Sequence, residues 1–317
     1  MKILAIESSC DEFSISIIEE DKILCNIISS QIKDHQVYGG VVPELAARLH
    51  LQNMHIVLQS ALKETETTIE SIDYVAYTEK PGLIGSLIVG KTVAEAIALY
   101  IDKPLLPLHH IEGHIFGASI NHKFVYPVLA LVVSGGHTQI ELVHSPNEFE
   151  IIGTTQDDAI GECYDKVARV LGMGYPGGPL IDKLAQTGNS SKYLLPIAKN
   201  DNSFDFSYSG LKTAAINLIH NAEQKHEKLE LKDFCATFQF AATSILKIKL
   251  EKAVQKFKPL TLTVAGGVSA NSSIRKLIME IGNTYNLNTI IPDLEYCTDN
   301  AAMIAKLARE KLINQNH

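Results

Sequence analysis

The spacing of hydrophobic and polar residues predicts two similar β-hairpins, one near the start of each half of the chain. Residues 3–18 read as an apolar strand, a small polar turn and a second strand with hydrophobic residues at alternate positions. Residues 127–143 repeat this plan, and Ser134 in the second turn stands 125 residues after Ser9 in the first. The same separation aligns the alternating hydrophobic positions that follow. We therefore expect two similar lobes that face a cleft.

Helices and strands alternate along the rest of the chain. Long segments with apolar residues at helical spacing are separated by shorter apolar runs that read as buried strands, a pattern typical of an α/β fold. We place the first lobe at 1–125 and the second at 126–317, and we expect the last helix, 299–317, to pack back on the first lobe. The predicted helices span 43–62, 85–100, 112–120, 158–171, 179–186, 211–222 and 232–257, and two more begin at 271 and 298. The predicted strands outside the hairpins span 73–78, 104–108, 260–265 and 289–291.

Composition supports a folded protein and limits the function classes. The chain has 317 residues, which favours two domains, and its 46% hydrophobic and 20% charged residues exclude intrinsic disorder. The formal net charge is −8. Because affinity for phosphate rests on clustered lysine and arginine, such a chain is a poor stand-alone nucleic-acid binder. A nucleic-acid substrate would need a local basic strip or a partner.

Cysteine usage and the start of the chain predict an intracellular location. The five cysteines are scattered, without the close spacing of a zinc knuckle or a redox dithiol, so we expect reduced thiols. No uninterrupted apolar run reaches the ~18 residues of a membrane helix. Glu7 and Ser8 interrupt the apolar N-terminus before it forms a signal-peptide core. We therefore expect a soluble, cytoplasmic protein without membrane contact.

Residues 85–92 match the P-loop pattern G-x-x-x-x-G-K-[ST], but their context argues against a phosphate-binding loop. A P-loop follows directly on a buried strand and wraps its backbone amides around phosphate. Here Pro81 and Gly82 already form the turn after the strand, and Leu87 and Ile88 favour burial. We interpret the segment as an amphipathic helix whose glycines allow close packing.

Three histidines within six residues form the first candidate site. His110 and His114 are four residues apart, so on a helix both rings share one face and could bind one metal ion, although surface or capping histidines have the same spacing. Their position after a predicted strand of an α/β fold favours the metal. The zinc-protease signature H-E-x-x-H is absent, because Glu112 stands two places after His110. Asp299, at a predicted helix start, is a candidate carboxylate ligand or an ordinary N-cap.

Three glycine-rich turns are candidate sites for a nucleotide. The turn 134–138 joins two strands, and its bare backbone amides suit a phosphate or carboxylate. The turn 265–271 leads into a helix N-terminus, another favourable place for an anion, and the turn 175–179 precedes a further helix. Each alone is also explained as a tight turn, but together they favour a nucleotide held between the lobes. Asp165 and Asp182 could accept ribose hydroxyls or be exposed helix charges.

These motifs resemble the family of bacterial tRNA N6-adenosine threonylcarbamoyltransferases, in one order from Met1 to about Leu307. The strings that carry the resemblance are IESSCDE, YGGVVPELAAR, PGLIGSL, HHIEGH, LVVSGGHTQ, YDKVARVLG, YPGGP, FSYSGLKT, AGGVSAN and CTDNAAMIA. The resemblance implies the two-lobed α/β fold of actin, Hsp70 chaperones and sugar kinases, with the active site in the cleft between lobes. It also implies transfer of a threonylcarbamoyl group from threonylcarbamoyl-AMP to N6 of adenosine 37, in tRNAs reading codons that begin with adenine, with release of AMP.

The resemblance further implies which residues hold the metal and the donor. One divalent ion per chain, iron(II) or alternatively zinc, would be bound by His110, His114 and Asp299. The residues that would contact the adenylate donor are Val132, Val133, Ser134, Gly135, Gly136, Asp165, Gly178, Asp182 and Asn271.

The proton acceptor is less closely specified, and the partners come only from the resemblance. Asp11 and Glu12, on the first turn, would face the same cleft and are guesses for the catalytic base, as is His137. Family members work with an inactive, shorter paralogue and a small P-loop ATPase, which we expect beside the tRNA substrate. One departure is Lys80, where the family usually has glycine before Pro81; it puts the geometry of that exposed turn in doubt.

Two other classes of function remain open. An ATPase or kinase of the same fold would explain the hairpins and glycine turns, but it would not need both histidines and Asp299. A non-catalytic scaffold, like the inactive paralogue, would be expected to lose the histidine pair, which is present here.

Overall fold

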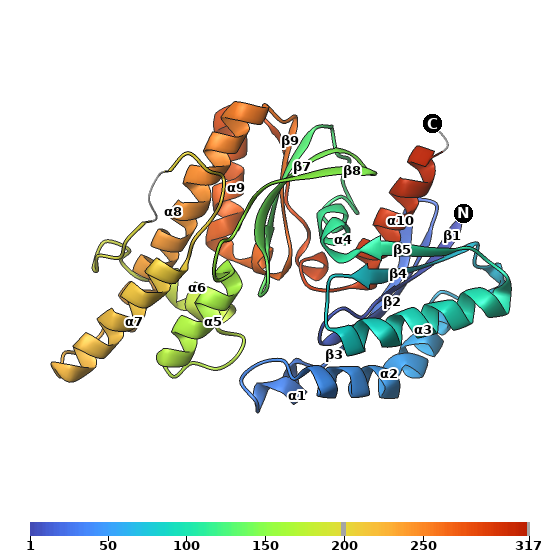
Figure 1. Ribbon diagram of the computed structural model, residues 1–317, viewed down its shortest axis with the longest axis horizontal. Helices are drawn as coiled ribbons and strands as arrows, with labels where there is room; N and C mark the ends of the chain where they lie inside the picture. Colours follow the sequence, from blue (N-terminus) through green and yellow to red (C-terminus); the bar gives the residue numbers. More distant parts are fainter. Residues whose placement is uncertain (198–200, 316–317) are drawn as a thin grey trace. The chain divides into compact units, whose positions relative to one another are not determined.

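The chain forms two compact units, each built on its own five-stranded sheet. The computed structural model describes residues 1–197 and 201–315. The first unit is Met1–Lys123 together with the segment from Pro292, and the second is Phe124–Ile291. Helices cover the sheet of each unit, as Figure 1 shows. The final helix therefore belongs to the first unit, although it is far from the rest of that unit in sequence.

The first unit has a mixed sheet in the order β3-β2-β1-β4-β5. β1 pairs antiparallel with β2 and parallel with β4, so the sheet changes direction at β1. The hydrophobic core between the sheet and helices α2 and α3 is made by residues such as Leu4, Val57 and Val89, while α10 contacts β1, β2 and α4. The elements of this unit are β1 (Lys2–Glu7), β2 (Glu12–Glu19), β3 (Lys22–Ser30), α1 (Ile32–Gln36), α2 (Pro43–Glu64), a 3-10 turn (Ile69–Ser71), β4 (Tyr74–Lys80), α3 (Ile84–Ile101), β5 (Leu105–His109), α4 (His110–Gly117), a 3-10 turn (Leu294–Tyr296) and α10 (Ala301–Gln315).

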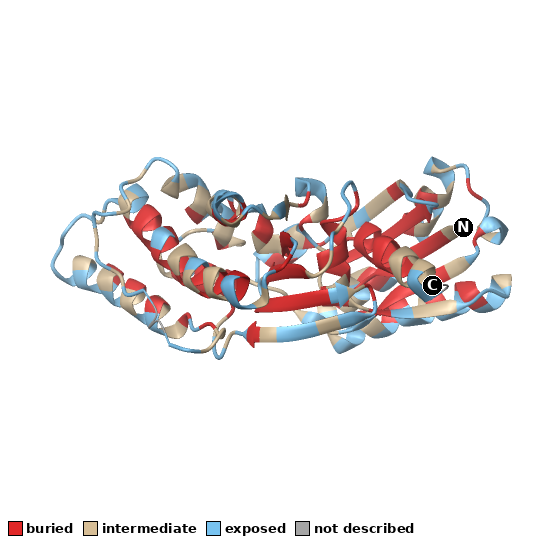
Figure 2. Cartoon of the chain, turned by 90° about the horizontal axis from the view of Figure 1, so that it is seen from above, coloured by how far each residue is buried: buried red, intermediate tan, exposed pale blue. Residues whose placement is uncertain are grey.

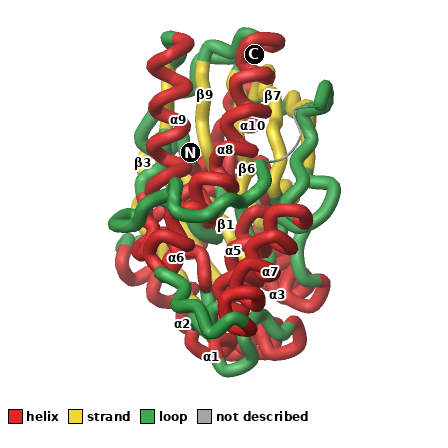
Figure 3. The backbone as a smooth tube through the Cα atoms, turned by 90° about the vertical axis from the view of Figure 1, so that its left-hand side faces the viewer, coloured by secondary structure: helices red, strands yellow, loops and turns green. Residues whose placement is uncertain are grey.

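The second unit has a sheet with the order β10-β9-β6-β7-β8. Its core packs the inner strands against long helices, and α8 lies against both α6 and α9 (Figure 3). Figure 2 shows that the central strands are buried along most of their length. The elements are β6 (Val128–Val133), β7 (Thr138–Ser145), β8 (Glu148–Thr154), α5 (Ile160–Val170), α6 (Gly177–Ala185), α7 (Ser209–Gln224), α8 (Leu231–Phe257), β9 (Thr261–Ala265), a 3-10 turn (Gly267–Ala270), α9 (Ser272–Tyr285) and β10 (Asn288–Ile290).

The two units repeat one topology, as the hairpin pattern predicts. β6, β7, β8, β9 and β10 occupy the places of β1, β2, β3, β4 and β5 in the strand order. Ile6 pairs with Ile15 in the first hairpin and Leu131 pairs with Ile140 in the second, so both partners are displaced by 125 residues. The separation read from the sequence is therefore the register of the structural repeat, and the predicted α/β fold is confirmed.

Two strands were not predicted, and both lie at the edge of a sheet. β3 and β8 carry mixtures of exposed, half-buried and buried residues, without the clean alternation of an inner strand. An edge strand has a neighbour on one side only, so polar residues there cost little. Hydrophobic period alone therefore fails to find such strands. Most other boundaries shift by one to three residues.

The P-loop-like segment is helical, as its context predicts. All of residues 85–92 lie inside α3. A Cβ on Gly90 would stand 2.0 Å from the Ser8 Oγ, so this glycine allows the helix to approach the turn after β1. By length and composition alone α3 could cross a membrane, but apolar helices packed in a protein core satisfy the same test. α3 contacts β4 and α2 in the first unit.

Candidate functional site

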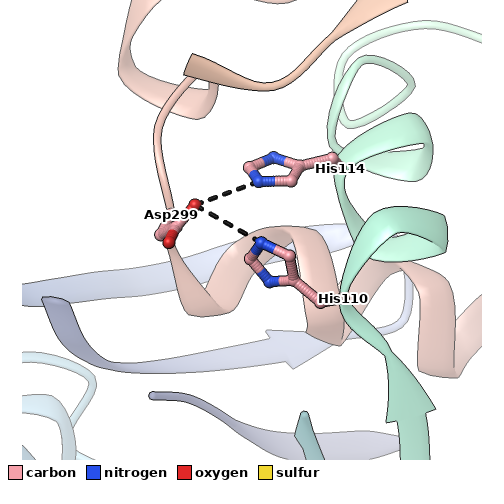
Figure 4. A group of neighbouring side chains, drawn as sticks. All are labelled: His110, His114 and Asp299. Carbon is pink, nitrogen blue, oxygen red and sulfur yellow. Dashed lines mark hydrogen bonds and ion pairs between the residues drawn. The ribbon is translucent and has the colours of Figure 1, made fainter. Parts of the chain in front are cut away.

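Two histidines and one aspartate meet in the first unit (Figure 4). β5 ends at His109 and α4 begins at His110, so the strand places the first turn of that helix at the sheet's edge. His110 and His114 follow one another by a helical turn, and their rings meet edge to face with centroids 4.6 Å apart. The segment before α10 brings Asp299 to them, although it is 185 residues from His114 in sequence. The predicted trio is thus assembled within one unit.

The trio has the geometry of a metal site. The Nε2 atom of His114 lies 3.0 Å from the Asp299 Oδ1, and the Nε2 atom of His110 lies 3.6 Å from the same oxygen. Two ligands of a tetrahedral zinc ion lie about 3.3 Å apart, a value that falls between these distances. Both rings present the nitrogen that commonly binds metals, and the three ligand atoms lie within 4.8 Å of one another. These three residues could hold one metal ion.

Asp299 does not cap the final helix, which was the alternative explanation for it. α10 begins at Ala301, and the Asn300 Oδ1 accepts a hydrogen bond from the Met303 N–H at 3.2 Å. This bond from the third following residue is the usual N-cap interaction. The cap is therefore Asn300, and the Asp299 carboxylate points to the histidines.

The site favours positive charge. Burial alone would lower the pKa of His110, but the carboxylates of Glu7 and Asp299 outweigh it and raise the pKa to about 9. Burial would likewise raise the pKa of Glu7, and the attraction of His110 instead keeps it below its ordinary value. In the metal-free site, the proton bound by His110 provides this positive charge. A divalent cation carries more charge and would suit the same carboxylate environment.

The turn after β1 and the start of β2 place two further carboxyl groups in the first unit. Glu12 is buried, and its pKa is raised to about 8, first by burial and then by the negative charges of Asp299 and Asp11. Asp11 is only half buried. Burial, followed by Asp299 and Asp11, also raises the pKa of the Cys10 thiol, so this cysteine is not a ready nucleophile.

In the second unit, the turn after β6 leaves open space around two glycines. The Ser134 Oγ accepts hydrogen bonds from the N–H groups of Gly136 and His137, at 3.3 and 3.0 Å. Gly135 and Gly136 both have negative φ, and a Cβ on either would meet nothing within 4 Å. Neither backbone conformation nor packing in the described structure requires glycine here. A ligand that approaches the bare backbone would require it, which favours the anion-binding interpretation over the tight-turn one.

Asp182 and Asn271 belong to one partly buried hydrogen-bond network. The Asp182 Oδ1 accepts from the Ser272 hydroxyl at 2.7 Å and from the Gln239 Nε2 at 2.8 Å. Asn271 caps α9, because its Oδ1 accepts from the N–H groups of Ser273 and Ile274, and its Nδ2 donates to the Gln239 Oε1 at 2.9 Å. The structure thus joins two predicted donor-binding residues through the amide of Gln239.

Gln239 was missed by sequence reasoning, although a signal was present. It lies in the middle of α8, where most neighbours are buried and apolar, and it is itself almost fully buried. A polar residue on the buried face of a helix must find hydrogen-bond partners inside the protein. A glutamine among apolar residues at helical spacing therefore indicates a buried network from the sequence pattern itself. Glu7, at the end of the apolar strand β1, gives the same kind of signal.

The remaining predicted donor-binding residues lie in β6, α5 and α6. Val132 and Val133 are buried in β6, and a Cβ on Gly266 would lie 2.5 Å from the Val133 carbonyl oxygen. Asp165 accepts a hydrogen bond from the Gly177 N–H at 2.7 Å, and burial raises its pKa against the effect of this bond. Gly178, half buried in the first turn of α6, has no close neighbour for a Cβ below 4.0 Å.

Comparisons with known proteins identify a family and a fold that this chain shares. Residues 22–306 match the family described as TsaD, tRNA N6-adenosine threonylcarbamoyltransferase. A protein of that name from Mesoplasma florum is 72% identical over the full length of both chains, and one from Mycoplasma capricolum is 69% identical over 100% of this chain and 99% of the other. Among solved structures, HypF of T. kodakarensis superimposes with a TM-score of 0.69 and 12% identity, over 99% of this chain and 48% of that one. The last likeness concerns the fold alone.

Proposed function

The chain belongs to the tRNA N6-adenosine threonylcarbamoyltransferase family, and we propose that it transfers a threonylcarbamoyl group to N6 of adenosine 37 in tRNAs that read codons beginning with adenine. The observation that carries the proposal is the coincidence of two findings. The family match extends over residues 22–306, and the trio His110, His114 and Asp299 within that range is assembled with metal-site geometry. A fold-related kinase would not need this trio.

We propose threonylcarbamoyl-AMP as the donor. In the transfer, a bond forms between adenosine N6 and the carbamoyl carbon, the bond from that carbon to the phosphate oxygen breaks, and AMP leaves with the electron pair. N6 gives up one proton. The anhydride already has a good leaving group, so no covalent enzyme intermediate is needed, and positioning of the weak nucleophile matters most.

The second unit provides the groups that would bind the donor. The open backbone at Gly135 and Gly136 would accept the phosphate, with Ser134 holding the turn closed. Asp165, Asp182 and Asn271, together with Val132, Val133 and Gly178, would contact the rest of the adenylate. The network through Gln239 supports this role because it fixes the orientation of two of these side chains.

One metal ion, iron(II) or alternatively zinc, would be held by His110, His114 and Asp299. When bound, such an ion acts as a Lewis acid that polarises the carbonyl group under attack. The protein's own part is to place two neutral imidazole nitrogens and one carboxylate oxygen around one point, and to surround it with buried carboxylates.

We assign the removal of the N6 proton to a carboxyl group at the start of β2. Glu12 is favoured over Asp11 because it is buried, and a carboxyl group with a pKa near neutrality can accept and release a proton. A Glu12→Gln variant should keep its metal and lose at least about a hundredfold in transfer rate. An unchanged rate would contradict this assignment.

The charge of the chain is compatible with the partners that the family resemblance implies. A net charge of −8 is unfavourable for binding tRNA by this chain alone, so an assembly should share the task. We propose the inactive, shorter paralogue and a small P-loop ATPase as members of that assembly, and the cytoplasm as its location.

Nucleoside analysis of tRNA tests the proposed function. Unmodified tRNA is incubated with threonine, bicarbonate, ATP, the partners and this chain, then digested and analysed by mass spectrometry. Threonylcarbamoyladenosine should appear only when this chain is present. Adenylate that accumulates unconsumed in the complete mixture would indicate a scaffold or a fold-related ATPase instead.

A further inference from the structure

Glu7 is a buried carboxylate with no assigned role, and it touches a ring of the metal trio. It is the last residue of β1, and its side chain is completely buried. Its Oε2 lies 3.1 Å from the Nδ1 atom of His110, on the opposite side of the ring from the nitrogen that faces Asp299. We propose that Glu7 is a positioning residue that holds His110 in the tautomer and orientation needed to bind the metal. This inference rests on the metal site of the proposed function.

The carboxylate of Glu7 is itself held in place on both oxygens. Its Oε1 accepts a hydrogen bond from the Ser9 N–H at 2.6 Å, and its Oε2 accepts one from the Thr78 hydroxyl. Thr78 lies on β4, which pairs with β1 in the sheet, so this partner comes from a rigid element. A carboxylate fixed in this way offers His110 one defined hydrogen-bond acceptor.

The contact selects one tautomer of His110. An ionised carboxylate only accepts hydrogen bonds, so Nδ1 must carry the proton, and the lone pair of Nε2 is left to face Asp299 and the metal. The Ser9 hydroxyl also lies 3.1 Å from Nδ1 and could donate to it in the other tautomer. That arrangement would set the lone pairs of Nδ1 and the Glu7 Oε2 against each other at 3.1 Å. The Nδ1–H form avoids this repulsion.

His114 shows that the contact is specific to one ring. Its Nδ1 is buried and has no hydrogen-bond partner among the described residues. Its ring is placed by packing against His110 and by the Asp299 carboxylate. A change in the orientation of His110 would therefore also change the orientation of His114. Glu7 thus positions both rings through its contact with His110.

Metal affinity measures this role directly. Zinc binding to the full-length chain is measured by competition with a chromophoric chelator, and Glu7→Gln is compared with Glu79→Gln, an exposed glutamate at the end of β4. Glutamine has one accepting atom, so it cannot serve both Ser9 and His110. Loss of such a contact typically weakens metal binding about 10–100-fold, and we expect a loss in this range for Glu7→Gln and none for Glu79→Gln.

Further measurements separate positioning from a merely structural role. Long-range ¹H–¹⁵N spectra of the metal-free proteins, recorded above about pH 9 where His110 is neutral, should show its Nδ1–H tautomer in the wild type and the loss of this tautomer in Glu7→Gln. If Glu7→Gln does not fold, Glu7→Asp keeps the charge but withdraws it from the ring, and it should weaken zinc binding as well. Wild-type affinity in a folded Glu7 variant would overturn the inference alone. A wild-type chain that binds no zinc or iron(II) would overturn the metal site and this inference with it.

Discussion

At the scale of single residues, the candidate site depends on charges that are buried together. Glu7 and Glu12 are buried in the first unit with His110 and His114. The cost of burying these two carboxyl groups is offset by attraction to a positive charge at Glu7 and by the raised pKa that keeps the proton on Glu12. The metal-free site is therefore sensitive to pH. This sensitivity gives a test that needs no substrate.

In metal-free protein, folding stability should decrease as His110 loses its proton. The carboxylates outweigh burial and raise its pKa to about 9, above its ordinary value of 6.5. The proton is thus bound more tightly in the folded chain, and its stabilising effect is complete below about pH 6.5 and lost as the pH rises through about 9. Urea unfolding with a chelator present should show a loss of up to about 3 kcal/mol over this range.

His110→Gln is the matched variant for this measurement, because it replaces the titrating ring with an uncharged polar side chain and so removes the His110–Glu7 charge pair. The wild type should lose more stability than the variant between about pH 6.5 and pH 9. Glu12 loses its proton over an overlapping range in both proteins, so only their difference reports on His110 and its pair with Glu7. If the two proteins lose equal stability over this pH range, the pKa of His110 is not raised in the folded chain.

At the scale of elements, the hydrophobic period predicted the inner strands and the long helices. It did not predict the edge strands or the hydrogen-bond networks. β3 and β8 lie at sheet edges, where polar residues are tolerated, so their sequences lack a clean pattern. The histidine pair could be found because one helix carries both rings. The contact of Glu7 with His110 joins residues 103 apart in sequence, and no local pattern reports such a contact.

The helical state of α3 predicts that its P-loop-like lysine is dispensable. Lys91 is exposed and forms a pair with Glu95 one turn later, at 3.7 Å. An exposed pair of this kind is worth under about 1 kcal/mol. Lys91→Ala should therefore leave the transfer rate within about twofold of wild type. A loss above about a hundredfold, as expected for a phosphate-binding lysine, would reinstate the P-loop interpretation.

The network at the centre of α8 predicts a different sensitivity. Gln239→Leu removes four hydrogen bonds and leaves the buried amide of Asn271 without one partner. Unsatisfied buried groups cost about 1–3 kcal/mol each, so urea unfolding should show a loss of at least this size, together with weaker binding of AMP. Gln255→Leu, on the exposed side of the same helix, is the control. Equal effects of the two substitutions would contradict a special role for the network.

At the scale of the whole molecule, a duplicated fold carries two different kinds of site. Both units share one strand order and one hairpin register, yet the first gathers histidines and carboxylates while the second gathers glycine turns and a polar network. The duplication was visible in the sequence because it rests on hydrophobic spacing. The division of roles rests on a few residues in turns after the strands, where a fold places its chemistry.

The central claim is that this chain carries out the transfer with its metal trio. Preformed threonylcarbamoyl-AMP with labelled threonine is mixed in a single turnover with unmodified tRNA, the partners and this chain, and label at N6 of adenosine 37 is followed. The wild type and a His55→Ala, His122→Ala control, which changes two exposed histidines, should transfer the label. The His110→Ala, His114→Ala variant should lose more than about a hundredfold in rate. Transfer at the wild-type rate by that variant, folded and free of metal, would contradict the proposed function.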